Sequence, residues 1–300
     1  MTTTPYHALP AFLATELSEQ DLDPRSVYDF ILAALEEDLP DGSVDVTSVA
    51  TIPAEAQGVA DFSIREDGVL AGMTIAEMVF HVVMGNSVTV SDRATDGTRV
   101  RRGNVAMTVA GPVQGLLTAE RTALNIACHL SGVATATSHW VAALSGTRAR
   151  VLDTRKTLPG WRALQKYAVR CGGGVNHRFS LSDMALIKDN HVIAAGGVVP
   201  ALEAVRRDFP GVPVEVEVTT LEQLHELLEV GVDRVLLDNM SDEMMRQAVE
   251  ITGGRCVLEA SGGLTLQRAR SVAETGVDYI SVGALTHSVK VFDIGMDLRE

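Results

Sequence analysis

Lysine is almost absent from this 300-residue chain, which contains only four. Three of them, Lys156, Lys166 and Lys188, lie in one short stretch, while arginine supplies the other 21 strong cations. From Arg148 to His191 there are nine basic and three acidic residues, a local charge of +6 in a chain whose net charge is −14. Because a basic segment in an acidic protein concentrates small anions, we expect an anion-binding site here.

Long apolar runs and paired cysteines are also lacking. No run reaches the length of a membrane span, and the N-terminus does not resemble a signal peptide. The acidic balance argues against nucleic-acid and anionic-membrane partners, which are bound through many exposed cations. Three distant cysteines, Cys128, Cys171 and Cys256, fit neither a disulfide framework nor a zinc site. We predict a soluble cytoplasmic protein with no nucleic-acid or membrane partner.

Aromatic residues make up only 4% of the chain, so a core must be built from the abundant aliphatic residues. In the first half, Asp23-Pro24 is typical of a helix start, and residues 73–84 read as an apolar helix. We interpret residues 96–100 and 105–109 as the strands of a hairpin. The pattern is similar to a lipoyl domain, but no lysine precedes Lys156. That alternative is therefore excluded.

The second half alternates between short β-branched runs and helical patterns, after one long predicted helix over residues 118–144. The candidate strands cover residues 149–153, 184–187, 214–218, 234–237, 256–258 and 279–282. The candidate helices between them cover residues 161–170, 199–208, 221–229, 241–252 and 266–275. This alternation predicts a parallel sheet. Six units without a GxGxxG motif favour a barrel over an open doubly wound sheet, which stays the alternative.

Ionisable residues follow most of these predicted strands, where barrels carry their catalytic groups. The runs are Asp153-Thr154-Arg155-Lys156, Lys188-Asp189-Asn190-His191, Glu215-Val216-Glu217, Asp238-Asn239 and Glu259-Ala260-Ser261. Glu215 and Glu217 are two residues apart, so both point to one face of their strand. A buried ion pair is one interpretation of them. The other is that Glu217 and Asp238 hold Mg²⁺, with waters and substrate phosphates as the further ligands.

Small residues and cations complete the pattern. Ser261-Gly262-Gly263 and Gly283 follow the last two predicted strands, where barrels often bind phosphate through backbone N–H groups. The basic residues Arg155, Lys156, His177, Arg178 and Lys188 suit a substrate with two carboxylates, or with a carboxylate and a pyrophosphate. For His177 we favour anion binding over acid–base catalysis.

Other polar residues of this segment are given structural roles. We expect Arg162, Lys166 and Arg170, four residues apart on a helix, to form a solvated face. No histidine and acid are spaced to make Cys171 a nucleophile, so we expect it to fill space in a core or loop.

The motifs together resemble the quinolinate phosphoribosyltransferase family. The matching stretches are Thr118-Ala119-Glu120-Arg121-Thr122, Asp153-Thr154-Arg155-Lys156-Thr157, Lys166-Tyr167-Ala168-Val169-Arg170, Gly172-Gly173-Gly174, Asn176-His177-Arg178, Ile187-Lys188-Asp189-Asn190-His191, Glu215-Val216-Glu217-Val218, Leu236-Leu237-Asp238-Asn239, Glu259-Ala260-Ser261-Gly262-Gly263 and Val282-Gly283-Ala284-Leu285-Thr286-His287-Ser288. The resemblance implies an α/β fold, in which an N-terminal α/β sandwich domain over residues 1–125 precedes an incomplete α/β barrel over 126–287. It also implies that the tail, 288–300, returns to the first domain.

The family's activity would be transfer of phosphoribosyl from phosphoribosyl pyrophosphate to quinolinate, with loss of CO₂ and formation of nicotinate mononucleotide for NAD biosynthesis. Mg²⁺ would be required, and a homodimer would share its active sites, with hexamers left open. The implied roles are as follows: Arg155, Lys156, His177 and Arg178 bind the quinolinate carboxylates, Arg121 reaches the partner's pocket, Lys188 lies near both substrates, Glu217 and Asp238 position ribose and Mg²⁺, and Ser261, Gly262, Gly263, Gly283 and His287 hold the 5′-phosphate. Lys156, Lys188, Glu217 and Asp238 are the expected catalytic residues.

Three alternatives stay open at this point. A sister phosphoribosyltransferase would use nicotinate or another pyridine, and would release no CO₂. A non-catalytic phosphate sensor on the same barrel would not need the acids Glu217 and Asp238. A barrel aldolase would use Lys188 as a Schiff-base amine, which leaves Lys156 and the arginines without a purpose.

Overall fold

The computed structural model describes residues 3–300, which form two compact units. Of the described residues, the first unit comprises 3–136, Ala163–Gly173 and Val289–Glu300, and the second comprises Thr137–Arg162 and Gly174–Ser288. The chain therefore leaves the first unit and returns to it twice. Within the described residues, no helix is both long and apolar enough to cross a bilayer.

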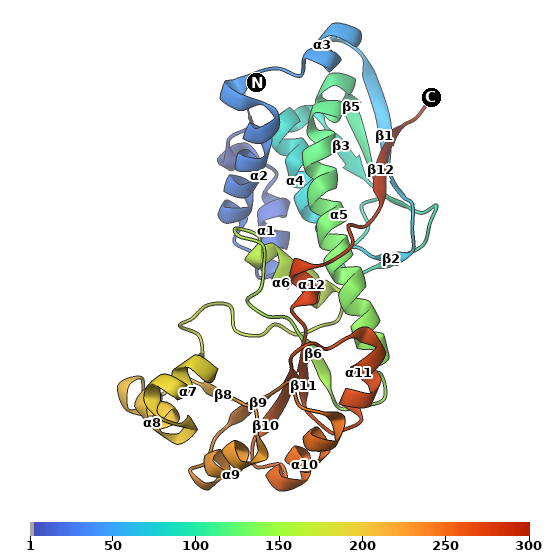
Figure 1. The fold of residues 1–300 in the computed structure, drawn as a ribbon. Helices are drawn as coiled ribbons and strands as arrows, with labels where there is room; N and C mark the ends of the chain where they lie inside the picture. The colour runs from blue at the N-terminus through green and yellow to red at the C-terminus, as the bar shows by residue number, and fades with distance from the viewer. Residues whose placement is uncertain (1–2) are drawn as a thin grey trace. The chain divides into compact units, whose positions relative to one another are not determined.

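The first unit combines a small antiparallel sheet with helices (Figure 1). Its strands are β1 (Gln57–Ile64), β2 (Gly68–Val69), β3 (Thr89–Ser91), β4 (Arg99–Val100), β5 (Val105–Pro112) and β12 (Ile294–Leu298). Its helices are α1 (Ala11–Glu19), α2 (Pro24–Asp38), α3 (Val46–Thr51), α4 (Met73–Met84), most of α5 (Val113–Ala143) and α6 (Arg162–Cys171), with 3₁₀ turns at Tyr6–Ala8, Pro40–Gly42 and Gly85–Ser87. The main sheet has the order β12-β1-β5-β3, so a strand from the C-terminal tail forms one of its edges.

Local chemistry explains where these helices begin. The Asp23 carboxylate accepts the Ser26 N–H at 2.9 Å, and Pro24 is the first residue of α2, so the predicted helix start is confirmed. Helix α4 spans the predicted residues 73–84 and is buried along nearly its whole length. The long helix α5 begins at Val113 rather than at residue 118.

The predicted hairpin of residues 96–100 and 105–109 is wrong. Strand β4 pairs with β2, whereas β5 pairs with β1 and β3. The reason lies in the segment before β4, where the Asp96 carboxylate accepts the N–H groups of Gly72 and Met73 at 2.9 Å each and so caps α4. This contact holds the segment beside β2, and its backbone is not available to β5.

The solvated face predicted for Arg162, Lys166 and Arg170 is wrong for Lys166, which is only 2% exposed. Helix α6 belongs to the first unit, where the Tyr167 hydroxyl donates to Asp96 at 2.7 Å and Arg170 bonds to the Gln20 carbonyl. Burial and the neighbouring Asp96 charge raise the pKa of the Cys171 thiol to about 12. Cys171 is thus a packing residue with little thiolate character.

The second unit contains the alternating strands and helices. The strands are β6 (Arg150–Leu152), β7 (Ala185–Ile187), β8 (Val214–Val218), β9 (Arg234–Asp238), β10 (Val257–Ser261) and β11 (Tyr279–Ser281). The helices are α7 (Asp189–Ala195), α8 (Val198–Asp208), α9 (Leu221–Glu229), α10 (Asp242–Thr252), α11 (Leu266–Ala273) and α12 (Ala284–His287). Helices α8 to α11 follow the outside of the sheet in an arc (Figure 1). Every predicted strand and helix of this half is present, with ends shifted by a few residues.

The six parallel strands have the order β6-β11-β10-β9-β8-β7. The first strand of the unit, β6, pairs with the last, β11, which is the neighbour order of a barrel and not the reversed order of a doubly wound sheet. Strands β6 and β7 do not pair in the described structure. The expected incomplete α/β barrel is therefore confirmed, and it has an open seam between β6 and β7.

A candidate active site at the carboxyl ends of the barrel strands

Two adjoining cavities open at the carboxyl ends of the parallel strands. The smaller has a volume of about 220 Å³ and the larger about 590 Å³. Five residues line both cavities, namely Thr154, Lys156, Lys188, Ser261 and Ser281. The two cavities are therefore one continuous site with two compartments, and two lysines stand where the compartments meet.

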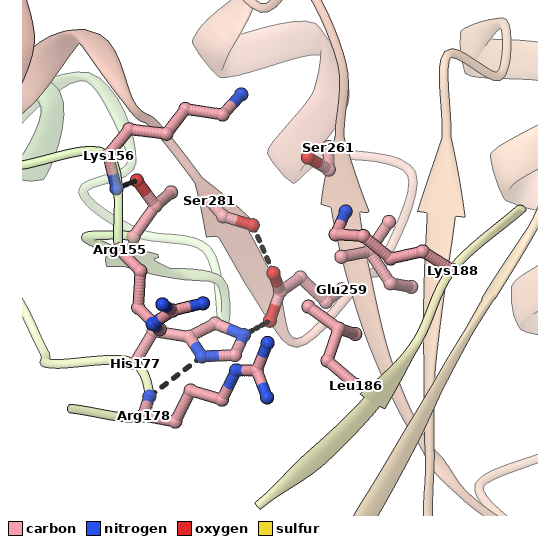
Figure 2. A pocket seen from close by; sticks show the side chains of 11 residues that line it. Arg155, Lys156, His177, Arg178, Leu186, Lys188, Glu259, Ser261 and Ser281 are labelled. Atoms are coloured by element: carbon pink, nitrogen blue, oxygen red, sulfur yellow. Dashed lines mark hydrogen bonds and ion pairs between the residues drawn. The ribbon is translucent and has the colours of Figure 1, made fainter. Parts of the chain in front are cut away.

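The smaller compartment is surrounded by cations (Figure 2). Arg155, Lys156, Arg178 and Lys188 line it together with Leu186 and Leu236. The Nε of Arg155 is buried and has no hydrogen-bond partner in the described structure. A buried donor without an acceptor is costly, so this compartment is built to receive an anion.

Arg178 bridges the open seam of the barrel. Its guanidinium donates to the Met184 carbonyl, just before β7, at 2.7 Å. Burial lowers the pKa of Arg178, and the nearby charge of Arg155 lowers it further. Two like charges held close together favour binding of a negatively charged ligand between them.

A buried cluster of charges forms the floor of this compartment. Glu215 on β8 and Glu259 on β10 are both fully buried, and Arg234 on β9 donates to both carboxylates. The His177 Nε2 lies 3.0 Å from Glu215 and 3.5 Å from Glu259. Ser281 donates to Glu259, a contact that Figure 2 marks together with that of His177. Glu215 thus takes part in a buried ion pair, the first of the two interpretations of the strand acids.

The two buried carboxyls differ in acidity. Burial raises the pKa of Glu215, but the hydrogen bond from His177 and the charge of Arg234 outweigh it, so this pKa lies below its usual range. Burial raises the pKa of Glu259, and repulsion from Glu215 raises it further. The neighbouring groups therefore favour the ionised form of Glu215 over that of Glu259. Although His177, Glu215 and Glu259 place possible metal ligands within 4.8 Å of one another, Arg234 already supplies the cation there.

The larger compartment contains the acids predicted to bind a metal ion. Glu217 and Asp238 line it at the ends of β8 and β9, beside Asn239. The Lys188 Nζ donates to Glu217 at 2.6 Å, and the Asn239 amide donates to Asp238 at 2.8 Å. Carboxylate oxygens paired this way are positioned on an open, polar wall.

Glycines also shape the lining of this compartment. Gly262 has a left-handed φ of 93°, and a Cβ there would lie 2.8 Å from the Asn239 backbone nitrogen. A Cβ at Gly283 would lie 3.0 Å from the Lys156 side chain and 3.1 Å from the His287 Nε2. Only glycine leaves these backbone groups accessible, as phosphate binding through N–H groups requires.

Most of the predicted site residues are brought together, and one is not. The two cavities are lined by Arg155, Lys156, His177, Arg178, Lys188, Glu217, Asp238, Ser261, Gly262, Gly263, Gly283 and His287. Arg121 lines neither of them. It lies on α5 in the first unit, where it donates to Asn125 at 2.6 Å beside a separate cavity of about 740 Å³.

Several residues of the site were not predicted from the sequence. Thr154 accepts the Lys156 N–H at 3.0 Å, and Thr286 donates to the Lys156 carbonyl at 2.8 Å, so both fix the backbone that carries Lys156. Arg234 lies at the start of its strand, whereas the residue patterns that predict functional groups lie at the strand ends. Its register opposite Glu215 was the signal that could have identified it.

Comparison with known proteins gives one consistent answer. Residues 45–131 match the N-terminal domain model of quinolinate phosphoribosyl transferase, and residues 133–297 match its C-terminal domain model. The chain is 51% identical to a carboxylating nicotinate-nucleotide pyrophosphorylase of Mycobacterium leprae, over 94% of this chain and all of that protein.

Solved structures agree with these matches. A nicotinate-nucleotide pyrophosphorylase from Francisella tularensis is 37% identical and superposes with a TM-score of 0.87, covering 92% of this chain and 96% of that one. NadC from Streptococcus pyogenes is 40% identical with a TM-score of 0.88, covering 93% and 99%. With the motifs, the barrel order and both domain models in agreement, this chain belongs to the quinolinate phosphoribosyltransferase family.

Proposed function

We propose that this protein transfers phosphoribosyl from phosphoribosyl pyrophosphate to quinolinate with decarboxylation, forming nicotinate mononucleotide, pyrophosphate and CO₂ for NAD biosynthesis. The observation that carries this proposal is the two-compartment site, in which a cation-lined cavity adjoins a polar cavity with acids and glycines. A small dianion fits the first, and a phosphorylated sugar fits the second.

The cations account for recognition of quinolinate. Arg155 and Arg178 bind the adjacent carboxylates, because guanidinium groups pair with carboxylates in a bidentate manner. Lys188 and Lys156 stand at the junction of the compartments, where the pyridine nitrogen meets the sugar. An aldolase role for Lys188 is disfavoured because its Nζ is paired with Glu217 at 2.6 Å.

The chemistry follows from this placement. A bond forms between the pyridine nitrogen and C1 of ribose while the bond from C1 to pyrophosphate breaks. Glu217 and Asp238 stabilise the positive charge that develops on the sugar, and the lysines stabilise the departing pyrophosphate. When the 2-carboxylate departs as CO₂, its bonding electron pair stays on C2, where the adjacent cationic ring nitrogen stabilises it, and a proton then takes the vacated position at C2. The protein supplies orientation and desolvation for this step.

We also propose Mg²⁺ as the cofactor. The side chains present fit this ion, because Glu217 and Asp238 offer hard carboxylate oxygens on one wall of the larger compartment. When bound, Mg²⁺ would neutralise charge on the pyrophosphate of the substrate. Lys188, which now donates to Glu217, would share that carboxylate with the ion or turn towards the phosphate. Chelation with EDTA should abolish turnover, and added Mg²⁺ should restore it.

A homodimer with shared sites is the proposed assembly, and sedimentation analysis will show whether such dimers form hexamers. The support is Arg121, a residue of a matching family motif that lies on α5 in the first unit, and the resemblance to the family implies that this arginine enters the pocket of a partner. A second copy would provide the pocket that this guanidinium enters. We also propose a cytoplasmic location, which the free thiols of Cys128, Cys171 and Cys256 support.

One assay tests the proposed function directly. Purified protein is incubated with carboxyl-labelled quinolinate, phosphoribosyl pyrophosphate and Mg²⁺, and both CO₂ and pyridine mononucleotide are measured. We expect equal amounts of the two products. Nicotinate in place of quinolinate should give little product, because one carboxylate leaves an arginine unpaired. Turnover of nicotinate alone would contradict the proposal and indicate the sister activity.

A further inference from the structure

His177 is held by hydrogen bonds on both sides of its ring. Its Nε2 lies 3.0 Å from the Glu215 carboxylate in the buried floor. Its Nδ1 lies 2.7 Å from the backbone nitrogen of Arg178, whose N–H it accepts. The ring is nearly inaccessible, with 6% of the side chain exposed.

These contacts determine which nitrogen carries the proton. A backbone N–H can only donate, so Nδ1 must present its lone pair to Arg178. A carboxylate can only accept, so Nε2 must carry the hydrogen that points to Glu215. An imidazolium has a hydrogen on both nitrogens and would place an N–H against the Arg178 N–H. The arrangement is that of a neutral imidazole with its proton on Nε2.

The same contacts connect the buried floor to the wall of the anion compartment. The His177 backbone N–H donates to Asp153 at the end of β6 at 2.8 Å, while its ring reaches Glu215 on β8. The next residue, Arg178, donates its backbone N–H to this ring, and its guanidinium donates to the Met184 carbonyl before β7. The segment that carries Arg178 thus spans the seam where β6 and β7 fail to pair.

We propose that His177 is a neutral positioning residue that locks this segment across the open seam and so places Arg178 for a substrate carboxylate. It is not itself a cation that binds the substrate. This inference deepens the proposed function, on which its kinetic test depends, and it reassigns one residue expected to bind quinolinate. Arg155, Lys156, Arg178 and Lys188 then supply the positive charge of the compartment.

The groups that face His177 favour this assignment. Glu215 from β8 and Glu259 from β10 lie on one side, Arg234 from β9 bonds to both, and Asp153 follows β6. Arg234 already neutralises one carboxylate, and its ring contact with Tyr279 on β11 holds it there, 4.9 Å from the ring centroid. A hydrogen bond from neutral His177 satisfies Glu215 without adding a second cation beneath the arginines.

The tautomer can be measured without substrate. Protein labelled with ¹⁵N-histidine is compared by long-range ¹H–¹⁵N correlation with His177→Asn, which assigns the His177 signals by difference. Between pH 6.5 and 7.5 we expect one protonated nitrogen, Nε2, and one unprotonated nitrogen, Nδ1. Two protonated nitrogens, or the proton on Nδ1, would overturn the inference. Lack of activity on quinolinate would contradict only the proposed function, because this measurement needs no turnover.

Kinetics separate positioning from charge. In His177→Asn the amide oxygen can still accept the Arg178 N–H, whereas His177→Ala loses both ring contacts. We expect Ala to raise KM for quinolinate about 10-fold or more with a smaller change in kcat, and Asn to recover part of this loss. Because the positioning role needs no charge on His177, the ratio of KM between wild type and His177→Asn should not change across the pH range of the tautomer measurement, 6.5 to 7.5. A wild-type advantage that fades as pH rises through the ordinary histidine range would show that His177 acts as a cation.

A second histidine provides the matched control. His225 is exposed on α9, and its Nδ1 lies 2.9 Å from the Leu221 carbonyl. His225→Asn should leave KM, kcat and their pH dependence unchanged. Thermal unfolding of all variants shows whether the barrel stays folded. If His177→Ala is as stable as wild type and His177→Asn still recovers part of the KM, the role of His177 is positioning and not merely structural.

Discussion

Arg155 is the site residue whose side chain is least satisfied by the protein's own contacts and would gain most from the proposed ligand. Its buried Nε has no acceptor in the described structure, although it lines a compartment with three other cations. The protein therefore gains little stability from this side chain. A carboxylate that supplies the acceptor would gain from both its charge and its hydrogen bonds.

Arg155→Ala should consequently weaken quinolinate binding without unfolding the protein. Loss of a bidentate charged contact should remove roughly 2 kcal/mol or more of binding free energy. This loss corresponds to a rise of about 30-fold or more in KM for quinolinate. The melting temperature should be unchanged or slightly higher. Arg207→Ala, on the exposed end of α8, is the matched control and should have normal kinetics. Near-normal turnover in Arg155→Ala would remove this residue from the site.

Glu217 is predicted to act on the sugar and not on the pyridine. Glu217→Gln keeps the shape but removes the negative charge that faces the developing cation, so kcat should fall by about 100-fold or more. Quinolinate affinity, measured by calorimetry, should change by only a few-fold. Glu226→Gln on the exposed face of α9 serves as the control. A large loss of quinolinate affinity with unchanged kcat would reverse the proposed division between the compartments.

At the scale of elements, the site consists of loops that follow parallel strands. The loop after β10 carries Gly262, whose left-handed backbone brings it against Asn239 in the loop after β9. Two neighbouring loops therefore depend on the absence of one side chain.

Gly262→Ala tests this dependence, and Gly211 offers a matched control. Their φ angles are 93° and 92°, but a Cβ at Gly211 would have nothing within 4 Å. Gly211→Ala should cost about 1 to 2 kcal/mol of unfolding free energy from the backbone alone. Gly262→Ala should cost more and should also raise KM for phosphoribosyl pyrophosphate. Urea unfolding and initial rates measure the two effects. Equal costs with normal KM would show that the loop does not hold phosphate.

The sequence predicted the barrel elements well because each is encoded locally. Strand β8 spans the predicted residues 214–218, since two glutamates alternate with three valines. Helix α9 spans the predicted residues 221–229, where Thr220 caps the helix through the Gln223 N–H. The segments 96–100 and 105–109 both contain strands, but these strands do not pair with each other as predicted. The prediction of a hairpin failed because strand pairing there depends on a contact distant in the sequence, the capping of α4 by Asp96.

At the scale of the whole molecule, the proposed dimer makes a prediction that single mutants cannot. Arg121→Ala and Lys188→Ala should each be nearly inactive, because each homodimer would lack one essential cation in both sites. Mixed dimers should regain up to about a quarter of wild-type activity, since a random mixture is half heterodimer and each heterodimer has one intact site. The subunits are co-refolded or co-expressed and then assayed. No recovery in a verified heterodimer would show that the sites are not shared.

The sequence by itself determined the strand and helix order, the basic segment and the motifs that identify the family. These features can be predicted because each depends on residue types and hydrophobic periodicity within a short stretch of the chain. The tertiary structure decided which distant segments and side chains contact one another. It placed Lys166 and α6 in the first unit and left the seam between β6 and β7 open. It also brought Arg234 and His177 to the same buried carboxylate, that of Glu215. Such pairings join residues that are distant in the sequence, so only packing and burial determine them.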